Sequence, residues 1–565
     1  MSAAELQSGD IVFKNVSIVD GSGTVPRFQS NVVVRGDSIL CISESALLAA
    51  STPGVRIIDG QSGKLALSPG FIDMHAHSDL SLLHTPDHAA KLTQGVTLEV
   101  VGQDGIGYAP VDDGCLHHIR RQIAGWNGNP EEESFWRWRS VREYLDTLDS
   151  SRVATNVAYL VPQGNLRMLV LGYDPRAATQ DEIDKMKAIL ETAMNDGAVG
   201  MSSGLTYVPG MYASTSELGQ LLTVVARRGG YYCPHTRSYG KGAMDAFREM
   251  IGLARETGVR LHLTHATLNF AENRGRAAEF LQMIDSAIAD GIDITLDTYP
   301  YLPGSTTLAA LLPSWAGAGG IDATLERLKD PETVAKIRHD VEVVGTDGCH
   351  GCTLEWSTIE ICGVSNDPSL VSTCIGKTVA DIAASHNPPW DTFDVFVDIL
   401  LRDRLATTIL QHVGHEENVR AIMRHPQHTG GSDGILTAVK PHPRGWGTFA
   451  RYLGHYTREL PNGRARDLYA LDPDALSSYA TVQPVTIFEG GLEEAVAHLT
   501  SRSARVIGLK DRGLVRESYK ADLVLFDPET VEDPAKGIVT VMVNGVLALD
   551  EGKLTGQRSG QTLRA

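Results

Sequence analysis

Short apolar runs alternate with helical patterns through the middle of the chain, and few folds accommodate that order. Eight such runs occur, at residues 64–77, 95–105, 156–167, 198–207, 230–237, 259–267, 292–301 and 428–435. Helical patterns lie between several of them, such as residues 179–196 and 243–258. Eight strands that alternate with helices are the number needed to close a barrel. We therefore predict an α/β fold, a (β/α)8 barrel of the TIM type, in which the short, glycine-rich eighth run is the weakest strand.

A long excursion separates the seventh and eighth predicted strands. It spans residues 303–425 and carries helical and strand patterns of its own. Long insertions at the end of a barrel strand often cover an active site. The sequence thus predicts a lid between strands 7 and 8.

The two ends of the chain resemble each other and differ from the middle. Short, β-branched runs separated by turn signals occur in residues 10–59 and again in residues 521–553. We predict one small β-sandwich domain that both termini build. The predicted boundaries are 1–66 for its N-terminal part, 67–495 for the barrel and 496–565 for its C-terminal part.

Composition narrows the range of partners. The chain has 565 residues, a net charge of −19 and a pI of about 5.4, which argues against nucleic acid or an anionic membrane surface. The first residues lack the pattern of a secretory signal, and no apolar run approaches the ~18 residues of a membrane helix.

Seven scattered cysteines fit reduced thiols in the cytoplasm, and we interpret Cys349 and Cys352 of "CHGC" as free thiols in a loop.

Potential metal ligands fall at the ends of the predicted strands. His75 and His77 are two residues apart, so they share a face of the first strand. On this motif alone, a metal site and a pair of ordinary histidines at a strand end are equally good interpretations. Barrel active sites lie at the carboxyl ends of the strands. Four further candidates lie at the ends of other predicted strands: Asp104, His235, His265 and Asp433. The sequence therefore predicts a metal site at the mouth of the barrel, where these strand ends meet.

Several motifs resemble the amidohydrolase superfamily and, within it, the N-acyl-D-amino-acid deacylases (D-aminoacylases). They include "PGFIDMHAHSD", "GAVGMSSGLTYVPG", "YPYLPGST" and "HPRGWGTFARYLGHY", and the resemblance runs along nearly the whole chain. The combination of "SDG" with "HPR" distinguishes this branch from hydantoinases and dihydroorotases.

The resemblance implies a set of site residues. His75, His77, His235 and His265 match the family's metal ligands, and Asp433 matches its catalytic aspartate, which we also expect to contact the metal. Similar proteins have a cysteine, in "GNCG", where this chain has Asp104 in "GQDG". A carboxylate is a harder ligand than a thiolate, so we expect one or two zinc ions or another divalent metal. Glu99, on the same strand, is interpreted as a buried structural partner.

The resemblance also implies substrate contacts. Arg444 matches the arginine that grips the α-carboxylate of the substrate, and Tyr299 and Ser305 match its other contacts. Thr267 stands where the family often has a lysine, which weakens the case for a strongly acidic substrate side chain.

We therefore expect a small-molecule amide that carries a carboxylate. The predicted reaction is hydrolysis of N-acyl-D-amino acids to a carboxylate and a free D-amino acid, with a metal-activated water and Asp433 as general base and acid. Two alternatives stay open: hydrolysis of another linear, cyclic or dipeptide-like amide, and a non-catalytic scaffold. The sequence leaves the oligomeric state open.

Overall fold

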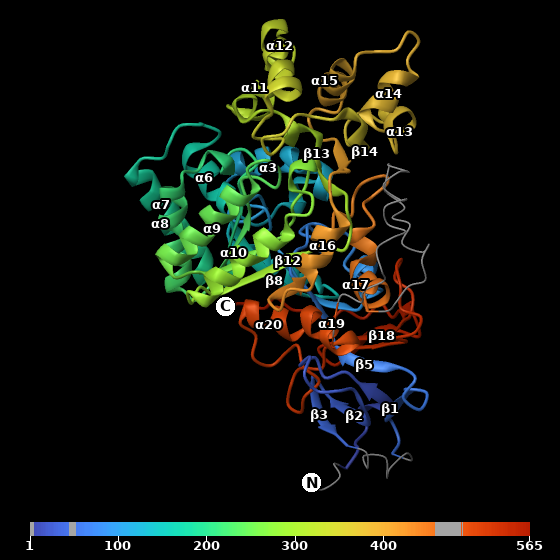
Figure 1. Cartoon of the computed structure of the whole chain (residues 1–565). Coiled ribbons are helices and arrows are strands. Elements are labelled where there is room, and N and C mark those ends of the chain that lie inside the picture. The colour runs from blue at the N-terminus through green and yellow to red at the C-terminus, as the bar shows by residue number, and fades with distance from the viewer. Residues whose placement is uncertain (1–4, 44–51, 458–487, 489) are drawn as a thin grey trace.

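The computed structural model describes residues 5–43, 52–457, 488 and 490–565. Its centre is a barrel of eight parallel strands (Figure 1). In spatial order these are β6 (Phe71–Asp73), β7 (Val96–Val101), β8 (Asn156–Pro162), β9 (Gly200–Gly204), β10 (Tyr231–His235), β11 (Arg260–Leu263), β12 (Ile294–Thr298) and β16 (His428–Gly430). All eight predicted strands are present, so the prediction of a (β/α)8 barrel is confirmed.

The first and last strands close the barrel through backbone contacts. The amide of Met74 donates to the carbonyl of Gly430 at 3.0 Å, and the amide of Asp433 donates to the carbonyl of His75 at 2.8 Å. A parallel bridge between Ala76 and Gly434 continues this pairing. The chain segments that carry two predicted ligands are thus fixed against each other by the closure itself.

Amphipathic helices cover the outside of the barrel. Helix α7 (Gln180–Asn195) begins with a capping box between Thr179 and Glu182, and it buries Ile183, Met186 and Leu190 on one face. Helices α8 (Thr215–Arg227), α9 (Ala243–Thr257) and α10 (Ala277–Ala289) follow it around the barrel in Figure 1. Helices α7 and α9 occupy the two segments where the sequence predicts them.

Strands from both ends of the chain build one β-domain, as predicted. The sequence predicts a sandwich there, and in the structure the strands pair into a single nine-stranded sheet. Its main order is β20-β19-β18-β17-β5-β1-β2-β3, with β4 paired to β1. The N-terminal strands are β1 (Ile11–Ile18), β2 (Phe28–Arg35), β3 (Ser38–Ile42), β4 (Arg56–Asp59) and β5 (Ala66–Pro69). The C-terminal strands are β17 (Leu523–Phe526), β18 (Ile538–Val543), β19 (Val546–Asp550) and β20 (Lys553–Leu554). Strand β5 joins the two groups because it pairs with both β1 and β17, so it spans the boundary predicted at residue 66.

The predicted insertion lies between β12 and β16. It contains the three-stranded sheet of β13 (Gly304–Thr307), β15 (Thr408–Gln411) and β14 (Ile359–Gly363). Its helices are α11 (Gly320–Arg327), α12 (Pro331–His339), α13 (Ser369–Cys374), α14 (Val379–Ser385) and α15 (Thr392–Arg402). They form a separate layer at the top of Figure 1 with a hydrophobic core of their own. That this layer acts as a lid stays a prediction.

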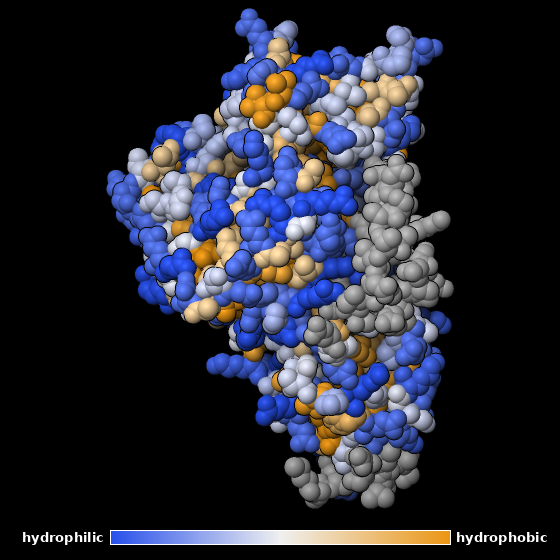
Figure 2. Space-filling view, in the orientation of Figure 1, coloured by the Kyte–Doolittle hydropathy of each residue, from blue (hydrophilic) through white to orange (hydrophobic). Residues whose placement is uncertain are grey.

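The surface carries few large hydrophobic groups. The face in Figure 2 is mostly hydrophilic, with a hydrophobic patch on the insertion. Within the described residues, no helix is both long and apolar enough to span a bilayer. The seven cysteines are free thiols, and Cys349 and Cys352 are buried in a loop of the insertion.

Candidate metal centre

The six predicted donors lie at one mouth of the barrel. His75 and His77 follow β6, and His235 is the last residue of β10. The remaining three occupy the short segments directly after β7, β11 and β16: Asp104, His265 and Asp433. The structure therefore brings together side chains that are up to 358 positions apart in the sequence (433 minus 75).

The donor atoms form two groups that share Asp104. One group contains His75, His77, Asp104 and Asp433, and the other contains Asp104, His235 and His265; within each group the donor atoms lie within 4.8 Å of one another. Oδ1 of Asp104 lies 3.3 Å from Nε2 of His265 and 3.7 Å from Nε2 of His75. Oδ2 lies 3.4 Å from Nε2 of His77 and 3.6 Å from Nδ1 of His235. The Asp104 carboxylate thus faces both groups at once, which suits a ligand that bridges two cations.

Hydroxyl groups hold the outer nitrogens of two histidines. Nδ1 of His75 is hydrogen bonded to Thr264, and Nε2 of His235 lies 2.8 Å from Oγ1 of Thr206. Nδ1 of His235 is buried and has no hydrogen-bond partner. Metal-bound histidines commonly use one nitrogen for the metal and the other for such an orienting bond. The buried, unpartnered nitrogen and the converging carboxylates therefore fit a divalent cation.

Three of the donors have unusual backbone conformations. The φ angles are +54° at Asp104, +29° at His265 and +49° at Asp433. Residues with a side chain adopt the left-handed region rarely, and such strain clusters at functional sites. Asp and His tolerate this region better than most residues, which helps to explain their presence at these tight strand ends.

Asp433 makes a different contact with each of its two oxygens. Oδ1 lies 3.2 Å from Nε2 of His77, whereas Oδ2 lies 2.9 Å from Nη1 of Arg444. Burial alone would raise the pKa of Asp433, but the positive charge of Arg444 and the adjacent histidines lower it below the ordinary value. Asp433 is consequently a carboxylate in the resting protein.

A cavity opens above the donor atoms. It encloses about 660 Å³, including the part that is open to solvent, and it is bounded by barrel loops and by the insertion. His77, Asp104, His235, His265 and Asp433 lie on its wall. A small molecule in this space would contact both donor groups and residues of the insertion.

Comparisons with known proteins agree with this arrangement. The sequence model of the amidohydrolase family matches residues 63–548. The chain belongs to the amidohydrolase family. It is 31% identical to the D-aminoacylase of Alcaligenes xylosoxydans xylosoxydans, over 100% of this chain and 99% of that protein. It is also 31% identical to the N-acyl-D-glutamate deacylase of the same organism, over 98% and 96% of the two chains.

A solved structure of a relative has the same overall fold. The N-acyl-D-glutamate deacylase of Bordetella bronchiseptica, complexed with zinc and a phosphonate inhibitor that mimics the tetrahedral intermediate, superposes with a TM-score of 0.76. The two sequences are 30% identical, and the match covers 99% of this chain and 100% of that chain.

The predicted substrate contacts of this amidohydrolase surround Arg444. Its guanidinium carbon lies 4.5 Å from the centre of the Tyr299 ring, and its Nη2 donates to the backbone carbonyl of Ser305 at 3.3 Å. The side chain is fully buried, and its Nε has no hydrogen-bond partner. Tyr299 and Ser305 line the cavity, whereas Arg444 is not among its lining residues. Tyr299 and Ser305 thus each contact Arg444. The role of the three residues in substrate binding stays a prediction.

Glu99 lies outside the donor groups of this amidohydrolase, among polar partners. Ser78 and Thr155 donate hydrogen bonds to its carboxylate at 2.7 and 2.9 Å, and Nε2 of His88 lies 2.6 Å from it. Burial would raise the pKa of Glu99, but His88 and Lys91 lower it to about 2. These contacts agree with the interpretation of Glu99 as a structural partner.

Several residues that line the cavity of this amidohydrolase were not predicted, among them Trp126, Tyr207 and His350. The ring of Trp126 packs 4.9 Å from that of His77, and the ring of Tyr207 packs 4.9 Å from that of His235. His350 comes from the insertion and has a φ of +58°. Tyr207 belongs to the motif "GLTYVPG" and His350 to "CHGC". Both motifs were recognised in the sequence, but these two residues were not identified as part of the site. Trp126 belongs to no such motif.

Proposed function

We propose that this amidohydrolase removes the acyl group from N-acyl-D-amino acids in a metal-dependent hydrolysis. The products are a carboxylate and a free D-amino acid. The observation that carries the proposal is the contact of Asp433 with His77 on one side and Arg444 on the other. This pair of contacts supports a role for Asp433 as proton carrier, next to a candidate metal centre and to a buried cation that suits a substrate carboxylate. The names of the relatives, D-aminoacylase and N-acyl-D-glutamate deacylase, support the choice of substrate.

The two donor groups would hold the metal. We propose zinc, in one or two ions per chain, on the basis of the four histidines and the zinc in the related deacylase structure. When bound, a divalent cation lowers the pKa of a coordinated water and polarises the amide carbonyl. Asp104 is a harder ligand than a thiolate, so manganese or cobalt is the alternative.

Asp433 would move the proton. Its lowered pKa keeps it in the carboxylate form, which can accept a proton. Its position on the cavity wall gives it access to a bound amide. We propose that Asp433 takes a proton from the attacking water and delivers it to the departing nitrogen. One carboxylate can perform both steps if it reaches both groups.

Arg444 would bind the α-carboxylate of the substrate. The guanidinium presents a rigid pair of donors, and its Nε is buried without a partner. Burial raises the pKa of Tyr299 to about 12, so its hydroxyl stays protonated and can donate to the same carboxylate. Ser305 accepts a hydrogen bond from Arg444 through its backbone carbonyl and completes the proposed set.

The proposed amino-acid side chain is uncharged. Thr267, Asn269 and Gln411 line the cavity and carry no charge. A strongly acidic side chain would lose its hydration there, and Thr267 supplies no positive charge to compensate, which is unfavourable.

Two other hypotheses compete with the deacylation of N-acyl-D-amino acids. Another amide or dipeptide-like substrate would use the same centre, whereas a non-catalytic scaffold would not need it. We also propose a cytoplasmic location, which the seven free thiols support.

A substrate screen tests the proposal. Purified protein with added zinc, cobalt or manganese is assayed on paired N-acetyl-D- and N-acetyl-L-amino acids, while its metal content is measured. We expect stoichiometric metal and preference for D-substrates. Activity only on other amides would support the first alternative, and protein without metal or activity would support the scaffold.

A further inference from the structure

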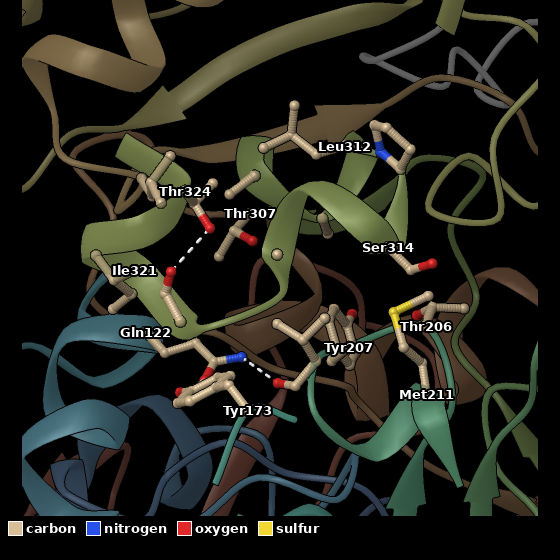
Figure 3. Close-up of a pocket in the computed structure, with 17 residues that line it drawn as sticks. Gln122, Tyr173, Thr206, Tyr207, Met211, Thr307, Leu312, Ser314, Ile321 and Thr324 are labelled. Atoms are coloured by element: carbon tan, nitrogen blue, oxygen red, sulfur yellow. Dashed lines mark hydrogen bonds between the residues drawn. The ribbon is translucent and has the colours of Figure 1, made fainter. Parts of the chain in front are cut away.

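A second cavity adjoins the candidate metal centre. It encloses about 630 Å³, including the part open to solvent. Figure 3 shows Thr307, Leu312 and Ile321 of the insertion on one side of it, and Gln122, Tyr173 and Tyr207 of the barrel loops on the other. We call this space the side cavity.

The side cavity and the metal cavity share part of their walls. Thr206, Tyr207 and Ala310 line both. Thr206 is the residue whose hydroxyl holds His235, and the Tyr207 ring packs against the same histidine. The side cavity is therefore separated from a predicted metal ligand by one layer of side chains.

The surface of the side cavity is predominantly apolar. Its apolar lining includes Val208, Met211, Leu312, Ile321 and Leu405.

Its main polar groups already have partners. Gln122 donates to the carbonyl of Val208 at 2.7 Å and accepts from the hydroxyl of Tyr173 at 2.7 Å. The hydroxyl of Thr324 donates to backbone carbonyls of Ala316 and Gly320. A polar ligand would find few free hydrogen-bonding groups here, whereas an apolar chain would lose none.

The barrel topology indicates which part of a substrate points toward the side cavity. Asp433 and Arg444 follow β16, whereas Tyr207 follows β9, and these strands are four positions apart among eight. They lie on opposite sides of the mouth. A substrate whose carboxylate is held by Arg444 and whose amide carbonyl reaches the donor groups would extend its acyl group across the mouth, toward Tyr207.

We propose that the side cavity receives the acyl chain of the substrate, and that this enzyme prefers N-acyl groups with an apolar chain several carbons long over N-acetyl groups. The proposal rests on the proposed function. It adds the class of acyl group and the residues that select it. Burial of each additional methylene should increase kcat/KM about fourfold until the cavity is filled.

The first experiment measures kcat/KM for N-acetyl-, N-butyryl-, N-hexanoyl- and N-octanoyl-D-leucine. In the natural protein we expect the value to rise with chain length. The variants Ile321→Trp in α11 and Ala309→Phe, next to the shared wall, place bulk in the side cavity from two different elements. Each should lower kcat/KM for the octanoyl substrate at least tenfold and change that for the acetyl substrate less than twofold. Val343→Trp is the matched control, because Val343 belongs to the same insertion but is 67% exposed.

A binding experiment separates this proposal from the proposed function. Calorimetric titration of the metal-loaded protein with octanoate and with acetate requires no turnover. Octanoate should bind more tightly than acetate, and Ile321→Trp and Ala309→Phe should abolish the difference while Val343→Trp keeps it. If N-acyl-D-amino acids were not hydrolysed but this pattern were seen, the proposed substrate would be wrong and the side cavity would still be an acyl site. Equal binding of octanoate and acetate, or equal losses along the substrate series in folded variants, would overturn the proposal.

Discussion

Nη1 of Arg444 lies 2.9 Å from Oδ2 of Asp433, so the proposed carboxylate-binding residue contacts the proposed proton carrier in the resting protein. A substrate carboxylate that binds Arg444 would compete with Asp433 for the guanidinium. The pKa of Asp433 should rise when that contact weakens, because Arg444 is the main charge that lowers it. Substrate binding would then make Asp433 a better proton acceptor.

Replacement of Arg444 should separate binding from this electrostatic effect. Arg444→Lys keeps a positive charge but loses the paired donors, so KM should rise about 10- to 100-fold for N-acyl amino acids. Arg444→Ala should also raise the pKa of Asp433, and since the carboxylate form is the active one, the acid limb of kcat/KM should move to higher pH. A simple amide without an α-carboxylate serves as the control. If both substrates lost the same fraction of kcat/KM in Arg444→Lys, the proposal that Arg444 binds the substrate carboxylate would be wrong.

Asp433→Asn should lower kcat by ~10²–10⁴-fold, the usual value of general acid–base catalysis. Asparagine also tolerates the left-handed backbone at this position, so the variant should keep its fold. Single-turnover kinetics and metal analysis check the prediction. A near-normal kcat would remove Asp433 from the proton transfer.

Removal of a histidine should reduce metal binding. His235→Ala or His265→Ala should weaken metal affinity by about 10–100-fold or more, and chelation should abolish activity until zinc is returned. His339→Ala is the matched control, since that side chain lies on α12 and is 63% exposed. Full metal content in both His235→Ala and His265→Ala would contradict the proposed ligands.

Asp104 should be needed for its charge as well as for its backbone conformation. Asp104→Asn tolerates the φ of +54° but removes the charge that faces both donor groups, so metal content should fall while the fold persists. Asp104→Cys should retain metal, since a thiolate is a good zinc ligand. Metal analysis by mass spectrometry distinguishes the variants. Unchanged metal content in Asp104→Asn would place Asp104 outside the metal site.

Thr267→Lys should change substrate preference. A lysine in this partly enclosed cavity would pair with an acidic side chain, so kcat/KM for N-acetyl-D-glutamate relative to N-acetyl-D-leucine should increase about tenfold. Thr267→Met adds bulk without charge and should not produce this shift. A greater preference for glutamate in both variants would show that size rather than charge determines it.

The sequence predicts the barrel well because local patterns determine it. Each strand is an apolar run with a polar or glycine-rich end, and even the three-residue strand β16 is detectable from "HTGG". The convergence of the six candidate donors is predictable for the same reason, since parallel strands bring their carboxyl ends to one mouth.

Contacts that depend on distances within the mouth are not predictable in this way. The position of Asp104 between two donor groups depends on left-handed turns after β7 and β11, and the contact of Asp433 with Arg444 depends on where α17 (Arg444–His455) begins. The side cavity requires the insertion to pack against the loop after β9. Each arises from tertiary packing between segments far apart in the chain.

Strand β5 pairs with β1 on one side and with β17 on the other. During synthesis, the first strands leave the ribosome long before residues 523–526 exist, so β5 must wait with one edge unpaired while the whole barrel is made. Nascent chains that end before β17 would expose this edge to other chains. The first strands are therefore protected from aggregation only after the last strands of the chain have been synthesised and have paired with β5.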